Sequence, residues 1–380
     1  MAPREKPAIL EAARDSLAVL KPAYEKGGLT LYLGAGVSMA SGLPSWSTLL
    51  ATLYHTAVGG AWKKKWQPYP NYLYAIGEWW LKQSGEAPEV IAEKVHCRPR
   101  RPNNSFHNEL RETLYLLWKK KQPDAQELTE KNSLLRSVAE LCRSTNETSG
   151  LHAVVTTNYD SLLEQALSGR NTKPKFKPVW HKDIELDRKT ERGIFHVHGY
   201  LPHRGTGSKE DDILLTESQY HKAASDPYSW SNLTLIQCFS SSVGLMVGMS
   251  MTDRNLRRLL YALSQTQLRR DVYLVLKRPE APRMTSCDID LIKENAATYA
   301  QRFPDYGFKT DEKAVEEIQE ISHALVPLEK GMTKDVLDRF GVKVIWVEDY
   351  EEVPVIVEAL IHPKSAPKAK SRATGATKTK

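Results

Sequence analysis

The sequence predicts an α/β fold, in which a parallel sheet is flanked by helices and carries a helical insertion. Three observations support this fold class. Six short runs are apolar on both faces, which is typical of strands buried in a parallel sheet. Helical stretches separate these runs, as expected for parallel strands, which need a crossover connection between them. Residues 57–146 interrupt this rhythm and contain no convincing strand. The apolar runs lie at 29–33, 152–157, 194–198, 243–248, 271–277 and 342–347.

The helices are predicted from apolar residues at helical spacing. The first covers residues 8–25, and Gly27 and Gly28 then stop it. Further helices are expected at 160–167, 255–268 and 355–361, and residues 296–340 are expected to be mainly helical.

This pattern divides the chain into four predicted parts. Residues 1–56 are predicted to form the first part of the sheet domain, and residues 147–362 its remainder. Between them, residues 57–146 form a helical insertion rich in Trp and Tyr. Residues 363–380 are rich in Lys, Ala, Thr and Pro, which bury too little surface to order the chain, so we expect a disordered basic tail.

Composition and charge narrow the class of protein. Hydrophobic residues make up 41% of the chain and charged residues 26%, close to the globular average. The net charge is +7, but the tail carries six Lys or Arg and no acid, so the first 362 residues have a charge of only +1. We therefore expect no direct nucleic-acid binding by the folded body. No apolar run approaches the ~20 residues that span a bilayer, and no signal peptide is recognised, which predicts a soluble, cytoplasmic protein.

The four cysteines are spaced at least 45 residues apart and form no CxxC pair. Zinc ribbons need such pairs, so no zinc or other metal site is expected. We interpret the four side chains as reduced thiols.

A glycine loop follows the first strand. Gly34-Ala35-Gly36-Val37-Ser38 lies between a strand and a helix, where glycines allow a tight turn and a close approach to a pyrophosphate. This context predicts a Rossmann-like phosphate site. A tight turn without a ligand is an equally good interpretation of these glycines alone, because short glycine motifs are weakly specific. The fuller GxGxxG pattern is absent, which disfavours a dehydrogenase.

The longer string GAGVSMASGLPSW, residues 34–46, resembles the sirtuin signature. Ser41-Gly42-Leu43-Pro44 matches the family's Ser-Gly-Ile-Pro turn, whereas Ser45-Trp46-Ser47 replaces its Asp-Phe-Arg trio. Three further blocks match in the same order as in the family. These blocks are Thr157-Asn158-Tyr159-Asp160, Phe195-His196-Val197-His198-Gly199 and Gly248-Met249-Ser250.

The resemblance implies an NAD site with two catalytic residues. Asn158 is suited to hold a water or a ribose hydroxyl, because its amide both donates and accepts. His198 directly precedes the glycine, as in the family, and an unperturbed pKa of about 6.5 suits a general base. We expect His196 to point to the opposite face and to be a core residue. The cofactor-binding residues implied are Gly34, Ala35, Gly36, Ser38, Pro44, Trp46, Asp160, Gly248, Ser250 and Asp253.

Several of these residues have a structural alternative. Asn158 and Asp160 are also typical helix caps, as are Asp253 and Asn255. Capping is the favoured role for Asn255. Trp46, at the family's Phe position, suits the nicotinamide end of a pocket or a plain core position equally well.

The missing zinc module favours one of the activities that the resemblance allows. Sirtuin deacylases bind the acyl peptide between the sheet domain and a four-cysteine zinc module, which this chain lacks. The zinc-free, helix-rich arrangement resembles the sirtuin-like NAD hydrolases of bacterial antiphage defence. That resemblance implies cleavage of NAD to nicotinamide and ADP-ribose, a homo-oligomer, and a HerA-type ATPase or a short Argonaute as partner.

Two alternatives stay open. One is an atypical NAD-dependent protein deacylase or ADP-ribosyltransferase, which shares the first bond cleavage. The other is a regulatory subunit that binds NAD or ADP-ribose without catalysis. Asn158 and His198 argue against pure binding, because binding alone needs no general base.

Overall fold

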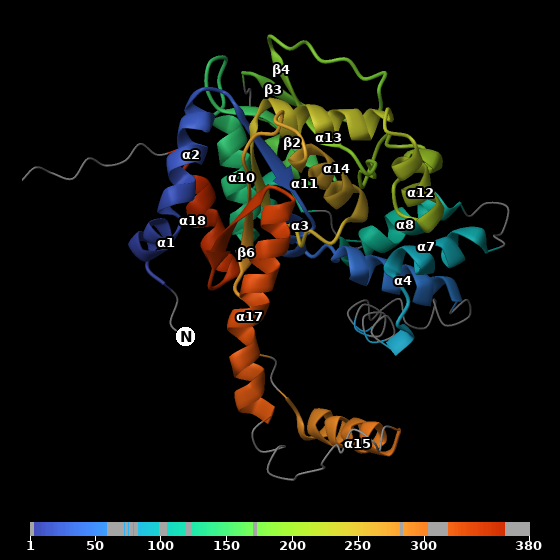
Figure 1. The fold of residues 1–380 in the computed structure, drawn as a ribbon. Coiled ribbons are helices and arrows are strands. Elements are labelled where there is room, and N and C mark those ends of the chain that lie inside the picture. Colours follow the sequence, from blue (N-terminus) through green and yellow to red (C-terminus); the bar gives the residue numbers. More distant parts are fainter. Residues whose placement is uncertain are drawn as a thin grey trace, which may run out of the picture.

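The computed structural model confirms the predicted α/β fold (Figure 1). It describes residues 4–58, 83–98, 105–118, 123–169, 173–281, 284–302 and 318–361, with Tyr72, Ala75 and Trp79 as single residues. Within these residues, seven parallel strands form one sheet in the order β3-β4-β2-β1-β5-β6-β7. They are β1 (Leu29–Leu33), β2 (Leu151–Thr156), β3 (Lys175–Val179), β4 (Glu191–His196), β5 (Val243–Val247), β6 (Val272–Lys277) and β7 (Val342–Val347).

Helices cover both faces of the sheet, because its central strands are apolar on both sides. In β1, Leu31 and Tyr32 are both buried but belong to different core clusters, as alternation along a strand requires. The cluster of Leu31 includes residues of α1 (Lys6–Ala12), α2 (Arg14–Glu25), α10 (Ser133–Arg143), α11 (Leu162–Leu167) and α18 (Val353–Glu358). The cluster of Tyr32 includes residues of α13 (Trp230–Ser241), α14 (Arg254–Ser264) and the end of α17 (Ile318–Arg339).

The predicted elements and the observed ones agree closely, with two differences. All six predicted strands are present, but β3 was not predicted. The predicted N-terminal helix is two helices, α1 and α2, divided at Ala13. Ala13 is itself buried, so the helical spacing of apolar residues runs across the break.

The described part of the predicted helical insertion contains helices and no strand. Its helices include the end of α4 (Trp46–Val58), α7 (Pro88–Cys97), α8 (Phe106–Leu114), η1 (Leu116–Trp118), α9 (Ala125–Lys131) and α10. Helices α4, α7 and α8 pack together and lie beside the sheet in Figure 1, whereas α10 packs against α11 and α18. The boundaries at residues 57 and 146 stay a prediction. Trp62, Trp66 and Trp80 lie outside the described residues.

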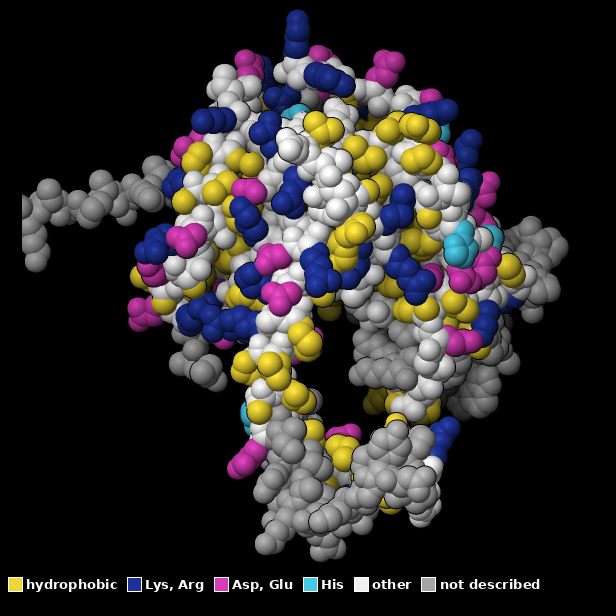
Figure 2. All heavy atoms as spheres, in the orientation of Figure 1, with side chains coloured by type: hydrophobic (Ala, Val, Ile, Leu, Met, Phe, Trp, Pro, Cys, Tyr) yellow, Lys and Arg dark blue, Asp and Glu magenta, His cyan; other side chains and the backbone are white. Residues whose placement is uncertain are grey.

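The segment predicted to be helical near the C-terminus contains α15 (Ser286–Arg302) and α17, which extend away from the sheet (Figure 1). Apolar side chains lie exposed along α17, and Figure 2 shows apolar atoms on this arm. They are Leu325, Leu328, Met332 and Val336. The predicted loop at 304–307 and the tail at 363–380 lie outside the described residues. No helix in the described part of the chain is long and apolar enough to cross a membrane.

The strand order reverses direction at β1. In the sheet, β2, β4 and β3 lie in that order on one side of β1, and β5, β6 and β7 lie on its other side. In open parallel sheets, ligands bind at the carboxyl ends of the strands on either side of such a reversal. The loops after β1 and β5 meet at this point.

Candidate active site

The glycine loop packs directly against the loop after β5. The N–H of Gly34 donates to Val247 O at 3.0 Å, and the N–H of Gly36 donates to Gly248 O at 2.9 Å. A Cβ atom on Gly34 would lie 2.5 Å from Gly248 O, and one on Gly36 would lie 2.8 Å from Gly248 Cα. The two loops therefore need glycine in order to touch, and Gly248 also has a φ of +68°.

This contact changes how the loop can meet a phosphate. The N–H groups of Gly34 and Gly36 donate to the β5 loop, and those of Val37 and Ser38 donate within the glycine loop itself. The helix that follows, α3 (Gly36–Met39), has only 4 residues. In this conformation the N–H groups of these four residues are therefore already used and do not bind a phosphate. The short helix α3 also contributes little helix dipole.

Asn158 joins the β1 loop to the end of β2. Its Nδ2 donates to Gly34 O at 3.0 Å and to Ser38 Oγ at 3.2 Å. Both amide hydrogens are thus used within the protein, which fixes the direction of the amide and leaves Oδ1 as the group offered to a ligand. Among the described residues, no hydrogen bond is made to Oδ1. Half-buried Asn158 therefore presents an acceptor at the edge of the sheet.

Asp160 both orients this network and caps a helix. Its Oδ2 accepts from Ser38 Oγ at 2.8 Å, and its Oδ1 accepts from the N–H of Leu162 at 3.0 Å, at the start of α11. The bond to Leu162 agrees with the structural role at the start of a helix, and the expected contact of Asp160 with the cofactor stays a prediction. Burial raises the pKa of Asp160, although its two hydrogen bonds oppose the shift.

His198 lies beside Asp253 with one ring nitrogen free. Its side chain is 4% exposed, and its Nε2 is buried without a hydrogen-bond partner, 3.6 Å from Asp253 Oδ2. Burial lowers the pKa of His198, while the negative charge of Asp253 acts in the opposite direction. A neutral, buried imidazole with an unpartnered nitrogen has the form that a general base requires.

Asp253 is held in place from two sides. Its Oδ1 accepts from the N–H of Leu256 at 2.6 Å, so it caps α14. Its Oδ2 accepts from the hydroxyl of Tyr220 at 2.7 Å. Tyr220 lies on α12 (Glu217–Ser225) and was not predicted as a site residue. The favoured capping role for Asn255 is wrong: Asn255 lies inside α14 and donates to Asn232 Oδ1 at 2.9 Å.

His196 and His198 meet opposite layers of the fold, as expected. His196 contacts Glu164 of α11, whereas His198 contacts Asp253 at the start of α14. Simple alternation is not the reason, because residues two apart in a regular strand share a face. The strand β4 ends at His196, and the N–H of Gly199 donates to His196 O at 3.1 Å in the turn that separates the rings.

The remaining predicted cofactor residues lie nearby but are less tightly arranged. Trp46 is half-buried and packs against the core. Pro44 and Ala35 are half-buried, and Ser250 is exposed, with its Oγ 2.8 Å from Thr252 Oγ1. The structure thus brings Gly34, Ser38, Asn158 and Asp160 into one hydrogen-bonded network, but it does not bring Ser250 to that network.

A small cavity lies behind Asn158. Its volume of about 20 Å³ holds roughly one water molecule and is far too small for a nucleotide. Its polar lining comes from Ser38, Thr156, Asn158, Asp160, Glu164 and His196.

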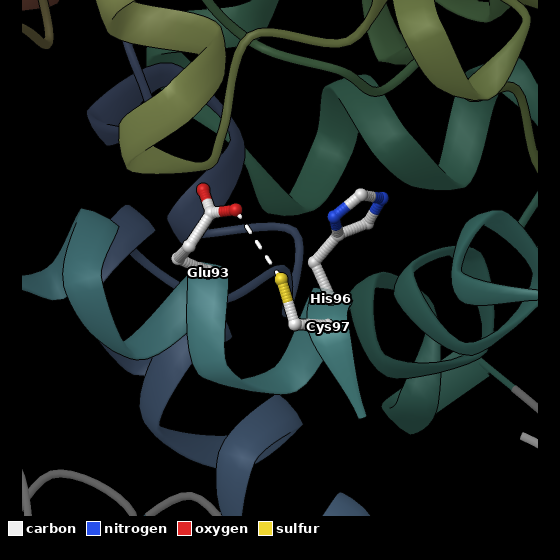
Figure 3. Close-up of side chains that lie close together, drawn as sticks. All are labelled: Glu93, His96 and Cys97. Atoms are coloured by element: carbon white, nitrogen blue, oxygen red, sulfur yellow. Dashed lines mark hydrogen bonds between the residues drawn. The ribbon is translucent and has the colours of Figure 1, made fainter. Parts of the chain in front are cut away.

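Away from this site, the described residues contain one group with potential metal ligands, which Figure 3 shows on α7. Glu93, His96 and Cys97 lie one helical turn apart, and the Cys97 thiol donates to Glu93 Oε1 at 3.4 Å. The other Glu93 oxygen accepts from the N–H of Ser218, and His96 Nε2 lies 3.2 Å from Glu210 Oε1. These contacts attach α7 to neighbouring segments, so packing explains the cluster. None of the four cysteines forms a disulfide bond.

Two comparisons with known proteins bear on this site. Residues 152–299 match the family model of the SIR2-like domain, a range that contains Asn158, Asp160, His198, Gly248 and Asp253. Over 343 residues the chain is 22% identical to the NAD(+) hydrolase ThsA of Enterococcus faecium. That alignment covers 89% of this chain and 56% of the relative, so the chain spans little more than half the length of that protein.

Proposed function

We propose that this chain is a SIR2-like NAD hydrolase, which cleaves NAD to nicotinamide and ADP-ribose. The observation that carries the proposal is the fixed amide of Asn158, whose Oδ1 keeps its acceptor capacity where the loop after β1 meets the end of β2. The match of residues 152–299 to the SIR2-like domain and the similarity to an NAD(+) hydrolase support the same substrate.

The proposed reaction needs positioning and a base more than a strong nucleophile. The oxygen of a water forms a bond to the anomeric carbon of the nicotinamide ribose, while the bond from that carbon to the pyridinium nitrogen breaks. The bonding electrons return to the ring, and nicotinamide leaves as a neutral molecule. Asn158 Oδ1 accepts a hydrogen bond from the water or a ribose hydroxyl, and so holds it in line. His198 accepts the water's proton through Nε2.

The base role fits the surroundings of His198. An imidazole must be neutral to accept a proton, and burial favours the neutral form by lowering the pKa of His198. Once protonated, the ring gains the attraction of Asp253 at 3.6 Å. Tyr220 holds that carboxylate in position, so the positive charge that forms during the reaction has a fixed partner.

The test is an incubation of the purified chain with NAD, with products separated by chromatography. Nicotinamide and ADP-ribose in equal amounts, without any added peptide, support the proposal. Turnover that requires an acyl-lysine peptide and yields O-acyl-ADP-ribose would instead identify a deacylase. Transfer of radiolabel from NAD to protein would identify an ADP-ribosyltransferase, and tight binding without turnover a regulatory subunit.

We further propose that the chain is a cytoplasmic effector of antiphage defence that works as a homo-oligomer, with the helical insertion at its interface or over the NAD site. A HerA-type ATPase or a short Argonaute is the proposed partner. The support is the resemblance to the defence NAD hydrolases together with exposed Trp79. Trp118, by contrast, is buried and donates to Ser41 O at 3.0 Å, so it attaches the insertion to the sheet domain. Light scattering at micromolar concentration tests the assembly, and a monomer with and without partner would refute it.

A further inference from the structure

Both ring nitrogens of His196 face hydrogen-bond acceptors. Nδ1 lies 3.1 Å from the main-chain oxygen of Asn158, and Nε2 lies 2.7 Å from Glu164 Oε1. The side chain of His196 is 1% exposed, so water does not replace either partner. A carbonyl oxygen can only accept a hydrogen bond, and therefore Nδ1 must carry a hydrogen.

The hydrogen on Nδ1 restricts the chemistry at Nε2. A neutral imidazole has a single N–H, so Nε2 carries a second hydrogen only if the ring is protonated. The alternative is a neutral ring that accepts a hydrogen from a protonated Glu164. In both arrangements one hydrogen lies between Nε2 and Glu164 Oε1, and the 2.7 Å separation is at the short end of the range for charge-assisted hydrogen bonds.

The surroundings of this pair are specific. Tyr200 packs against the His196 ring with centroids 4.4 Å apart, and the carboxyl of Asp160 acts electrostatically on both partners. The second oxygen of Glu164 is buried without a hydrogen-bond partner and belongs to a residue that lines the cavity behind Asn158. That cavity has room for about one water, which would complete the shell of the carboxylate.

We propose that Glu164 and His196 form a positioning pair for Asn158, in which His196 Nδ1 donates to the main-chain oxygen of Asn158 and Glu164 holds the ring through Nε2. This inference rests on the proposed function for its catalytic consequence. Asn158 then has two independent anchors. The β1 loop holds its side chain through Gly34 and Ser38, and β4 and α11 hold its main chain through the pair. Neither His196 nor Glu164 touches the reacting atoms.

Two substitutions of Glu164 separate positioning from general packing. In Glu164→Gln, the amide can donate to Nε2 of a neutral ring, so Nδ1 keeps its hydrogen and its bond to Asn158. We expect kcat within about threefold of the parent. In Glu164→Ala the ring loses that partner, and we expect kcat to fall about 10- to 100-fold with little change in KM. Glu147→Ala, on an exposed loop, is the matched control and should leave both constants unchanged.

Nuclear magnetic resonance of the ring nitrogens tests the pair without any turnover. In the parent, with ¹⁵N-labelled histidine, Nδ1 of His196 should show the shift of a ring nitrogen that carries a hydrogen. In Glu164→Gln, Nδ1 should keep that shift. The His196 signals are identified by their loss in His196→Gln.

The outcomes are distinct. A His196 Nδ1 without a hydrogen in the parent would overturn the proposal, as would an Ala variant that keeps the parent kcat, or a Gln variant as slow as the Ala variant. If the Ala variant does not fold, the Gln variant and the nitrogen shifts still decide. A parent that leaves NAD intact would refute the proposed function alone, because the ring shifts are measured in the absence of NAD.

Discussion

The N–H of Gly36 donates to the main-chain oxygen of Gly248 at 2.9 Å, which joins the loops after β1 and β5 where the strand order reverses. The contact is backbone against backbone, so no side chain can move aside to admit a larger residue. The backbone of Gly248 therefore leaves no room for a side chain at Gly36.

Gly36→Ala should therefore destabilise the fold. The new Cβ would lie 2.8 Å from Gly248 Cα, and separating the loops costs about 1–3 kcal/mol. We expect a lower midpoint of thermal unfolding and weaker NAD binding. Gly331→Ala is the control, because its Cβ would meet nothing within 4 Å in α17, and it should be neutral or stabilising by up to about 1 kcal/mol. Equal midpoints for Gly36→Ala and the parent would contradict the steric argument.

Asn158→Ala should remove turnover while the protein stays folded. The substitution deletes the acceptor Oδ1 and the two bonds that fix it, and we expect kcat to fall at least ~100-fold. Circular dichroism checks the fold and a chromatographic assay checks turnover. Asn295→Ala, exposed on α15, should behave as the parent. Parent-like kcat in Asn158→Ala would exclude this residue from the mechanism.

His198→Ala should reduce kcat by about 100- to 10,000-fold, the usual contribution of a general base. The ring makes no hydrogen bond through Nε2, so its removal should affect turnover more than stability. His221→Ala offers a control on α12, where the side chain is 78% exposed, and should leave kcat unchanged. Full activity in His198→Ala would assign the base to another group.

The pH dependence of kcat/KM should show the effect of burial on His198. Burial lowers the pKa of His198, so the ring stays neutral, and active, to a pH below the usual value of about 6.5. The midpoint of the acid limb of the kcat/KM profile should therefore lie below that value. Asp253→Asn removes the charge that raises the pKa of His198, so it should shift the limb further toward acid. Asp211→Asn, at an exposed position, should not move it. A limb above pH 7 in the parent would contradict the assignment.

The fold could be predicted because most strands are buried on both faces. Continuous apolar runs identified six strands, and β1 and β7 have the predicted bounds. The strand β3 escaped prediction because Lys175, Lys177 and Pro178 interrupt its apolar residues, which its position at one edge of the sheet tolerates. Its sequence therefore resembles that of a loop, whereas β7 at the other edge is mostly apolar and was recognised.

The site could be predicted only where it lies in motifs. Ser38, Asn158 and Asp160 were expected on sequence grounds and share one network. Glu164 and Tyr220 were missed because they act through other residues, and a single sequence does not show which side chains meet across elements. Glu164 had a weak signal, since it follows Asp160 by one helical turn, but Tyr220 had none.

The order of the strands also affects when the site can exist during protein synthesis. The groups of the site come from the ends of β1, β2, β4 and β5, and β1 lies between β2 and β5 in the sheet. While residues up to Asp253 are still in the ribosome, the folding chain lacks Gly248, against which Gly34 packs. It also lacks Asp253, which lies beside His198. Incomplete chains therefore cannot form the proposed site, which requires the four central strands to be paired.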